Sequence, residues 1–124
     1  MTTDELVNLH GVTVLRCTPD GPALDGERAA LDLIGDAMGR GADVVAVPAE
    51  RVAEEFFRLR SGVAGAVMQK FVNYRVRLAV VGDVSRHLDE SAALRDFVRE
   101  TNQGGHIWIV ANDDELDERL RPAG

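Results

Sequence analysis

Hydrophobic residues along the chain form short continuous runs that alternate with longer stretches of helical spacing. Continuous runs occupy residues 44–47, 78–81 and 107–110, and residues 12–17 form a similar stretch that is interrupted by Thr13 and Arg16. Short runs bounded by turn residues are typical of strands, and runs without polar residues are typical of strands buried on both faces. Residues 6–9, separated from the first run by Gly11, are predicted to form the other arm of a hairpin.

Helices are predicted between these strands and after the last one. Apolar residues recur at helical spacing from Glu27 to Gly39, where Gly39 and Gly41 supply a stop. Further helices are predicted for residues 62–74, for residues 91–102 with Ser91 as the cap, and from Asn112 onwards. Residues 49–60 fit either a short helix or a packed loop. The second helix has an expected inward stripe of Val63, Val67, Met68, Phe71 and Val72.

The elements follow the order β-β-α-β-α-β-α-β-α. Strands that alternate with helices imply right-handed crossovers and a mainly parallel sheet. A length of 124 residues suits one domain, residues 1–124. We therefore predict an α/β fold with a mixed, mainly parallel sheet of about four or five strands. The runs at 44–47 and 78–81 should be adjacent parallel strands.

Charge and composition narrow the function. The net charge is -7 and Lys70 is the only lysine, so binding to nucleic acid or to an anionic membrane is not expected. Cys17 is the only cysteine, so no internal disulfide is expected. The three histidines are scattered along the chain, so we expect no metal centre and no cofactor. The acidic N-terminus and the lack of a long apolar run favour the cytoplasm.

The start of the second main helix is the first candidate site. Ser61 would cap the first-turn N–H groups, and Gly62 and Gly65 would let a partner backbone or a phosphate approach closely. Arg60 would favour a bound anion. The alternative is that Ser61 is only a helix cap.

Two further residues follow a central strand. Asp83 ends the run at 78–81, where ligands gather in parallel sheets, and it also fits a turn residue that caps nearby N–H groups. His87 would serve with Asp83 as an acid–base pair in an enzyme, and the favoured interpretation is a solvated surface histidine. Cys17 is interpreted as a small buried hydrophobe.

The end of the second helix is a candidate interface. Lys70, Asn73, Tyr74 and Arg75 would form an edge that faces a partner, because Tyr and Arg are common interface anchors. A solvated helix end explains the same residues equally well.

Four stretches carry a family resemblance. They are Gly-Pro-Ala-Leu-Asp at 21–25, Arg-Ser-Gly-Val-Ala at 60–64, Val-Val-Gly-Asp-Val-Ser at 80–85 and residues 112–120. In this order they resemble a STAS domain, the fold of bacterial anti-sigma-factor antagonists and sulfate-transporter tails. The resemblance implies a regulatory, protein-binding role in which Ser61 matches the serine that partner kinases phosphorylate. Leu59 and Arg60 stand where antagonists carry Asp and Ser.

Residues 56–62 and 69–75 also resemble a bacterial domain family of unknown function, which implies no chemistry. The function expected from these observations is non-catalytic binding of a protein partner around Ser61. The alternative is a domain for a small ligand or anion, or a small enzyme, that uses Arg60, Ser61, Asp83 and His87 at the strand ends. A homodimer formed through the N-terminal edge strand is compatible with both.

Overall fold

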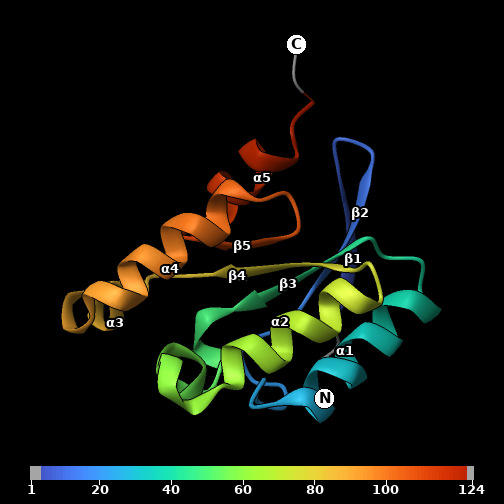
Figure 1. The fold of residues 1–124 in the computed structure, drawn as a ribbon. Helices are drawn as coiled ribbons and strands as arrows, with labels where there is room; N and C mark the ends of the chain where they lie inside the picture. Colours follow the sequence, from blue (N-terminus) through green and yellow to red (C-terminus); the bar gives the residue numbers. More distant parts are fainter. Residues whose placement is uncertain (1–3, 123–124) are drawn as a thin grey trace.

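The computed structural model describes residues 4–122 and contains one five-stranded sheet in the order β1-β2-β3-β4-β5 (Figure 1). β1 and β2 form an antiparallel hairpin, and every later neighbour is parallel. The predicted hairpin, the mixed sheet and the adjacency of β3 and β4 are confirmed. The strands are β1 (Glu5–Leu9), β2 (Val12–Arg16), β3 (Val44–Pro48), β4 (Arg77–Val81) and β5 (Ile107–Val110).

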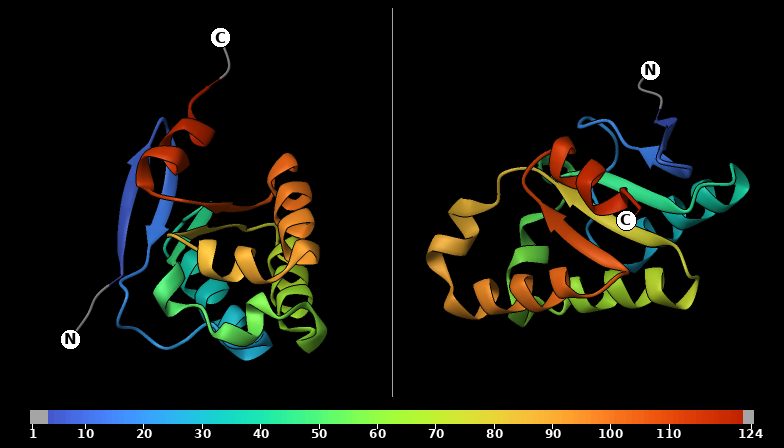
Figure 2. Two further views of the ribbon diagram at one scale, coloured as in Figure 1. Left: turned by 90° about the vertical axis from the view of Figure 1, so that its left-hand side faces the viewer. Right: turned by 90° about the horizontal axis from the view of Figure 1, so that it is seen from above.

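Helices cover both faces of the sheet (Figure 2). α1 (Glu27–Gly39), α2 (Val63–Asn73) and α4 (Ala92–Gln103) pack on one face, and α5 (Asp113–Leu120) packs on the other. The predicted helices are confirmed, but α3 (Ser85–Glu90) was not predicted. The open segment forms three 3-10 turns, η1 (Ala49–Arg51), η2 (Glu54–Phe57) and η3 (Leu59–Ser61).

Alternate strand residues point into two hydrophobic cores. Val45 and Val47 of β3 face α1 and α2, whereas Val44 and Ala46 face the α5 side, and all four are buried. This is why the central strands read as continuous apolar runs. On α2, Val67 and Phe71 are fully buried as predicted, but the prediction for Val72 is wrong because 47% of it is exposed.

The two edges of the sheet differ. At β5, the side chain of Asn102 accepts a hydrogen bond from Ile109 N–H (2.7 Å) and donates one to Ile109 O (2.9 Å). Asn102 thereby takes the place of a neighbouring strand at that edge. β1, the other edge, carries the exposed Leu6. An edge strand with unpaired backbone groups is the part of a sheet that can accept another strand.

Arg51 is the only buried charged residue in the described part of the chain. Its Nη1 atom donates to Asp4 Oδ1 (3.1 Å) and to Thr18 O (3.2 Å), and its Nε donates to Pro22 O (2.8 Å). The guanidinium packs so closely on Gly21 that a Cβ atom there would collide with it. The cation therefore joins η1, the start of β1 and the loop before α1.

A short β-bridge continues this connection. Leu24, which is fully buried, forms an isolated parallel bridge with Val52. Leu24 N–H donates to Arg51 O (2.8 Å), and Ala53 N–H donates to Leu24 O (3.1 Å). The loop before α1 and the turns after β3 therefore hold each other in place.

Arg75 ends α2 in an unusual conformation. Val76 N–H donates to Phe71 O and Arg75 N–H donates to Val72 O, each at 3.1 Å, which is the hydrogen-bond pattern of a Schellman motif. Arg75 occupies the left-handed position of this motif, with φ 58°. Glycine is favoured at such a position because it has no Cβ to clash with the backbone.

Acidification tests the Arg51–Asp4 pair. Burial raises the pKa of Asp4, but the Thr18 N–H bond and the charge and hydrogen bonds of Arg51 outweigh it, so the pKa is lowered overall. A lowered folded-state pKa means that the stabilisation exists above the unfolded pKa, about 3.9, and is lost as pH falls below it. At pH 7, Asp4→Asn should lower the free energy of unfolding by about 3 kcal/mol, because the buried cation keeps no counter-charge.

Urea unfolding across the acid range provides the measurement. The gap between wild type and Asp4→Asn should close as the pH falls below about 4. Asp96→Asn is the control, because the Asp96–Arg99 pair is exposed and should contribute under about 1 kcal/mol. A gap that stays constant with pH would contradict the role assigned to the Asp4 charge.

Arg75→Gly should raise the free energy of unfolding by about 0.5–1 kcal/mol, since relief of the left-handed strain exceeds the added entropy of the unfolded chain. Tyr74→Gly is the matched control. Tyr74 has φ -94°, so glycine there relieves no backbone strain and should lower the free energy of unfolding. Chemical denaturation of both variants measures the difference, and equal destabilisation would contradict the prediction.

Candidate functional site

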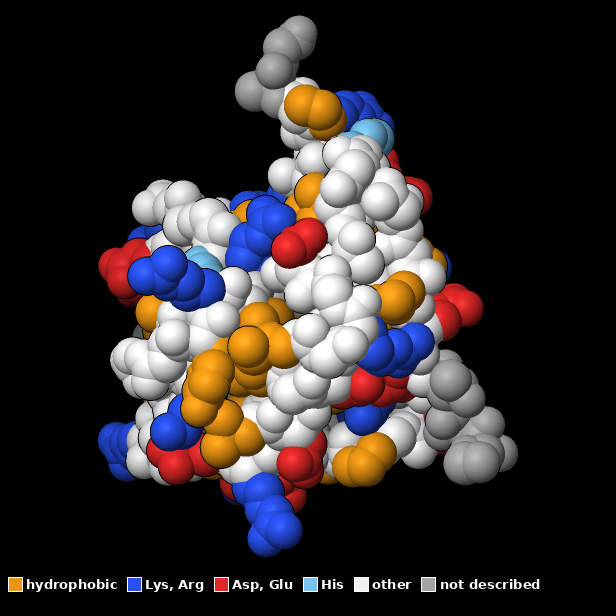
Figure 3. Space-filling view, turned by 90° about the vertical axis from the view of Figure 1, so that its right-hand side faces the viewer, with side chains coloured by type: hydrophobic (Ala, Val, Ile, Leu, Met, Phe, Trp, Pro, Cys, Tyr) orange, Lys and Arg blue, Asp and Glu red, His pale blue; other side chains and the backbone are white. Residues whose placement is uncertain are grey.

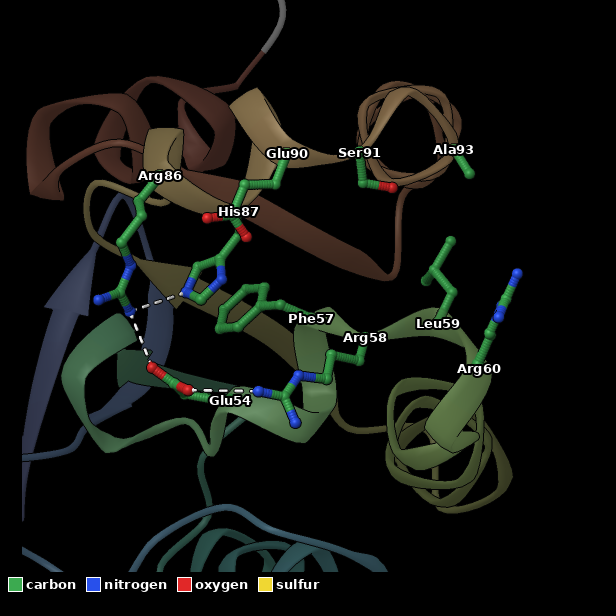
Figure 4. Close-up of a pocket in the computed structure, with 10 residues that line it drawn as sticks. All are labelled: Glu54, Phe57, Arg58, Leu59, Arg60, Arg86, His87, Glu90, Ser91 and Ala93. Carbon is green, nitrogen blue, oxygen red and sulfur yellow. Dashed lines mark hydrogen bonds and ion pairs between the residues drawn. The ribbon is translucent and has the colours of Figure 1, made fainter.

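A hollow of about 700 Å³ lies between the η2–η3 turns and helices α3 and α4 (Figure 4). η1 follows the carboxyl end of β3 and α3 follows that of β4, so the hollow lies beside the end of the sheet where ligands bind in parallel α/β folds. We call it the arginine hollow. Its lining residues are Glu54, Phe57, Arg58, Leu59, Arg60, Arg86, His87, Glu90, Ser91 and Ala93.

An aromatic stack lies at one side of the arginine hollow. The rings of Phe57 and His87 are parallel within 10°, with centroids 4.3 Å apart. Phe57 is buried and contacts Phe56 edge to face, so the stack is rooted in the core. His87 is half-buried rather than solvated as favoured from the sequence, because α3 brings its ring onto Phe57.

Three arginines face two glutamates around the hollow. Arg86 Nη2 lies 3.1 Å from Glu54 Oε1 and 3.3 Å from His87 Nε2, and Arg58 Nη2 lies 3.8 Å from Glu54 Oε2. Exposed pairs of this kind contribute little to stability. Arg60 forms no ion pair with any described residue. The hollow is therefore locally cationic in a chain whose net charge is -7.

Ser61 lies next to the arginine hollow but does not line it. Its hydroxyl donates to Glu55 O and accepts from Val63 N–H (3.2 Å). The N-cap position of α2 is Gly62, with φ 77°, so Ser61 caps the first N–H of the helix from the position before the N-cap. The chain enters α2 through η3 and needs a left-handed residue at the cap, a conformation that suits glycine.

Gly65 lies on the first turns of α2 and is exposed. A Cβ atom placed on Gly65 would meet no heavy atom within 4 Å. The sheet therefore does not require glycine here, and a partner can reach the helix backbone. Arg60, Ser61, Gly62 and Gly65 are exposed on both sides of the buried Ala64, and we call these four residues the α2 entrance.

Asp83 has the turn role that the sequence favoured. Its Oδ1 accepts a hydrogen bond from Ser85 N–H (2.9 Å), and the hydrogen bonds from the Ser85 side chain and N–H lower the pKa of Asp83. Asp83 and His87 line a hollow of about 520 Å³ that adjoins the arginine hollow. Within residues 4–122 no hydrogen bond joins them, so an acid–base pair is not assembled.

The end of α2 presents an exposed surface. Tyr74 is 48% exposed, Asn73 accepts a hydrogen bond from Gln69 (2.8 Å), and Lys70 is half-buried. Hydrophobic side chains gather on the side of the molecule where α1 and α2 end (Figure 3). The exposed Met38 and Val72 belong to these ends. The sequence analysis did not predict an exposed apolar surface here, because it assigned Val72 to the core.

Cys17 does not line the arginine hollow. Cys17 is buried as predicted, and burial together with the Asp4 charge raises the pKa of its thiol to about 12. In residues 4–122 no cluster of His, Cys, Asp or Glu could hold a metal ion. No helix of this part is both long and apolar enough to cross a membrane.

Comparison with known protein families shows which family the chain belongs to. The model of a domain of unknown function, DUF4180, matches residues 9–120. The chain belongs to this family. The DUF4180 match runs from the end of β1 to the end of α5 and so includes the α2 entrance and the arginine hollow. No curated protein and no solved structure matches the chain.

Proposed function

We propose that this DUF4180 domain is a non-catalytic regulatory module that binds another protein through the α2 entrance and the arginine hollow. The observation that carries the proposal is their juxtaposition. Arg60 belongs to both surfaces, because it lines the same hollow as the stacked Phe57 and His87 and directly precedes Ser61 and Gly62 in the chain. A protein partner could contact the exposed helix backbone of the α2 entrance and place a side chain in the neighbouring hollow.

The chemistry of the hollow defines the partner. Arginine and aromatic side chains are frequent anchors in protein interfaces, and the exposed part of the His87 ring is held in place by the buried Phe57. Arg58, Arg60 and Arg86 favour carboxylates, while Glu54 and Glu90 restrict how many can be accommodated. The partner should therefore present an apolar side chain flanked by acidic residues.

The proposal includes a STAS-like relationship. Its support is the opening hairpin, the buried Leu24 just before α1, and the crossover helix α2 that begins beside Ser61 and joins two adjacent parallel strands. In this relationship the phosphorylation state of Ser61 would control binding in the cytoplasm. The open edge of β1 offers a separate route to a homodimer.

A small organic anion in the arginine hollow is the second candidate. Its support is Arg60, which has no ion-pair partner among the described residues and lies across the hollow from His87 and Arg86 (Figure 4). A ligand that binds the folded state should raise the melting temperature of the pure protein. Such a rise without any captured protein would favour this candidate over the first.

Gly65→Leu should abolish partner capture and keep the fold. The new side chain enters open space on a helix, where leucine has a propensity about 0.8 kcal/mol better than glycine. Immobilised wild type and variants would be exposed to an extract of the source organism, and bound proteins quantified by mass spectrometry. Proteins captured by wild type, lost with Gly65→Leu and Arg60→Glu, and kept by Arg99→Glu on α4 would identify the partner. Equal capture by all four proteins would refute this contact surface.

Ser61→Asp should weaken binding of the captured partner at least about fivefold, because the carboxylate mimics a phosphate within the contact surface. Its stability should fall by about 1 kcal/mol, since aspartate cannot donate to Glu55 O. Ser61→Ala loses the same hydrogen bond without adding charge and is the control. Titration calorimetry should give near wild-type affinity for Ser61→Ala. Equal affinity for Ser61→Asp would exclude Ser61 from the contact surface.

A further inference from the structure

One edge of the sheet is occupied and the other is open. At β5 the side chain of Asn102 bonds to both backbone groups of Ile109, so that edge already has a substitute for a neighbouring strand. β1 lies at the outer side of the sheet, with no helix beyond it (Figure 2). An edge strand with free backbone groups can pair with a further strand.

The hydrogen bonds of β2 determine which backbone groups of β1 are free. Thr13 O and Cys17 N–H bond to residues 43 and 46 on the β3 side, at 2.8 and 2.9 Å. Backbone groups alternate in direction along a strand, so the even-numbered residues of β2 bond to their register partners, the odd-numbered residues of β1. Leu6 and Asn8 therefore direct their N–H and C=O groups away from the sheet.

The open part of this edge has defined ends. Before it, Arg40 Nη1 donates to Asp4 O (2.9 Å), so the carbonyl two residues before Leu6 already has a partner. After it, His10 has φ 55° and turns the chain out of the extended conformation. The N–H and C=O groups of Leu6 and Asn8 have no hydrogen-bond partner among the described residues. A pairing strand must therefore match these four groups.

A second copy of β1 matches the four groups in one antiparallel register. When the two-fold axis passes beside Val7, Leu6 of one copy lies opposite Asn8 of the other, and each free N–H meets a free C=O. A register centred on Leu6 would need the Asp4 carbonyl, which is already bonded. A register centred on Asn8 would need extended backbone at residue 10, inside the turn.

The side chains suit the same register. Val7, on the α5 face, would lie opposite Val7 of the other copy in a non-hydrogen-bonded pair, where side chains come closest. Leu6 is 39% exposed and lies on the α1 face, because its register partner Leu15 belongs to that core. It would lie diagonally across from the second Leu6. Glu5 would lie opposite Leu9, so no like charges are paired.

We infer that two copies of this chain form a homodimer in which their β1 strands pair antiparallel around Val7. The five-stranded sheets then join into one continuous sheet. Because Asn102 occupies the β5 edge, the pairing closes at two copies instead of extending into a fibre. The inference rests on the homodimer route of the proposed function and does not use the α2 entrance. One strand from each copy makes a small interface, so the dimer is weak and reversible.

Sedimentation velocity over a wide range of concentration tests the dimer. Wild type should shift from monomer to dimer as the concentration rises. Leu6→Pro should weaken dimerisation at least about tenfold, because proline has no N–H and removes two of the four hydrogen bonds between the copies. The Leu6 N–H points outward, so proline removes no hydrogen bond within the chain. Leu6→Val keeps the N–H and is the matched control, with dimerisation like wild type.

Val7→Cys tests the register. In the inferred pair the two new cysteines have Cβ atoms about 5 Å apart, so mild oxidation should link the copies through a disulfide. Leu9→Cys is the matched control, because the two residues 9 lie four positions apart along the paired strands, about 14 Å, and should stay unlinked. Cys17 is buried and does not compete.

A wild type that remains monomeric at every concentration would overturn the inference, as would equal linking of Val7→Cys and Leu9→Cys. Unchanged dimerisation of a folded Leu6→Pro would also overturn it, because the contact would then lie elsewhere. Circular dichroism checks the fold, and Val7→Cys decides the inference where Leu6→Pro is unfolded. A monomeric wild type that still captures a protein through the α2 entrance would overturn the dimer alone and leave the proposed partner binding intact.

Discussion

The buried guanidinium of Arg51 is the interaction on which the position of the candidate site depends. It connects three segments that are distant in sequence, since its hydrogen bonds reach Asp4, Thr18 and Pro22 from the turn after β3. A buried charge is tolerated only when its counter-ion and hydrogen-bond acceptors are in place. Two of the four acceptors of Arg51 are the backbone carbonyls of Thr18 and Pro22, so the loop before α1 must adopt one conformation for this network to form.

The segment η1 to η3 connects Arg51 to the arginine hollow. Contacts with other parts of the chain hold this segment in position. The Leu24–Val52 bridge fixes the beginning of this segment, the burial of Phe56 and Phe57 fixes its middle, and the Ser61–Glu55 contact closes its end. Phe57 is thereby held where its ring stacks on His87 of α3, which lies outside this segment. The hollow is thus held by core packing at its floor and by weak exposed ion pairs at its rim.

The sequence was sufficient for the strands and the longer helices because their signals are local. Val44 to Val47 are apolar without interruption, and Ser91 accepts the expected capping hydrogen bond from Leu94 N–H. The site depends on contacts that no local pattern contains. The Arg51–Asp4 and Phe57–His87 contacts join residues far apart in the chain, and α3 has no buried residue to produce an apolar periodicity. The sequence did not indicate that Gly62 is the N-cap residue of α2, because the 3-10 turn η3 that leads into the helix was not predicted.

The carboxyl ends of the strands carry polar hollows on both faces of the sheet, and Glu50 lines one on each side. Such a shared residue would couple the two faces only if it could move between two arrangements. Glu50 directly precedes Arg51, whose guanidinium is fixed by four hydrogen bonds to three residues. Any shift of the backbone at Glu50 would break that buried network. Glu50 can therefore respond to contacts on either face through its side chain, while its backbone stays in place.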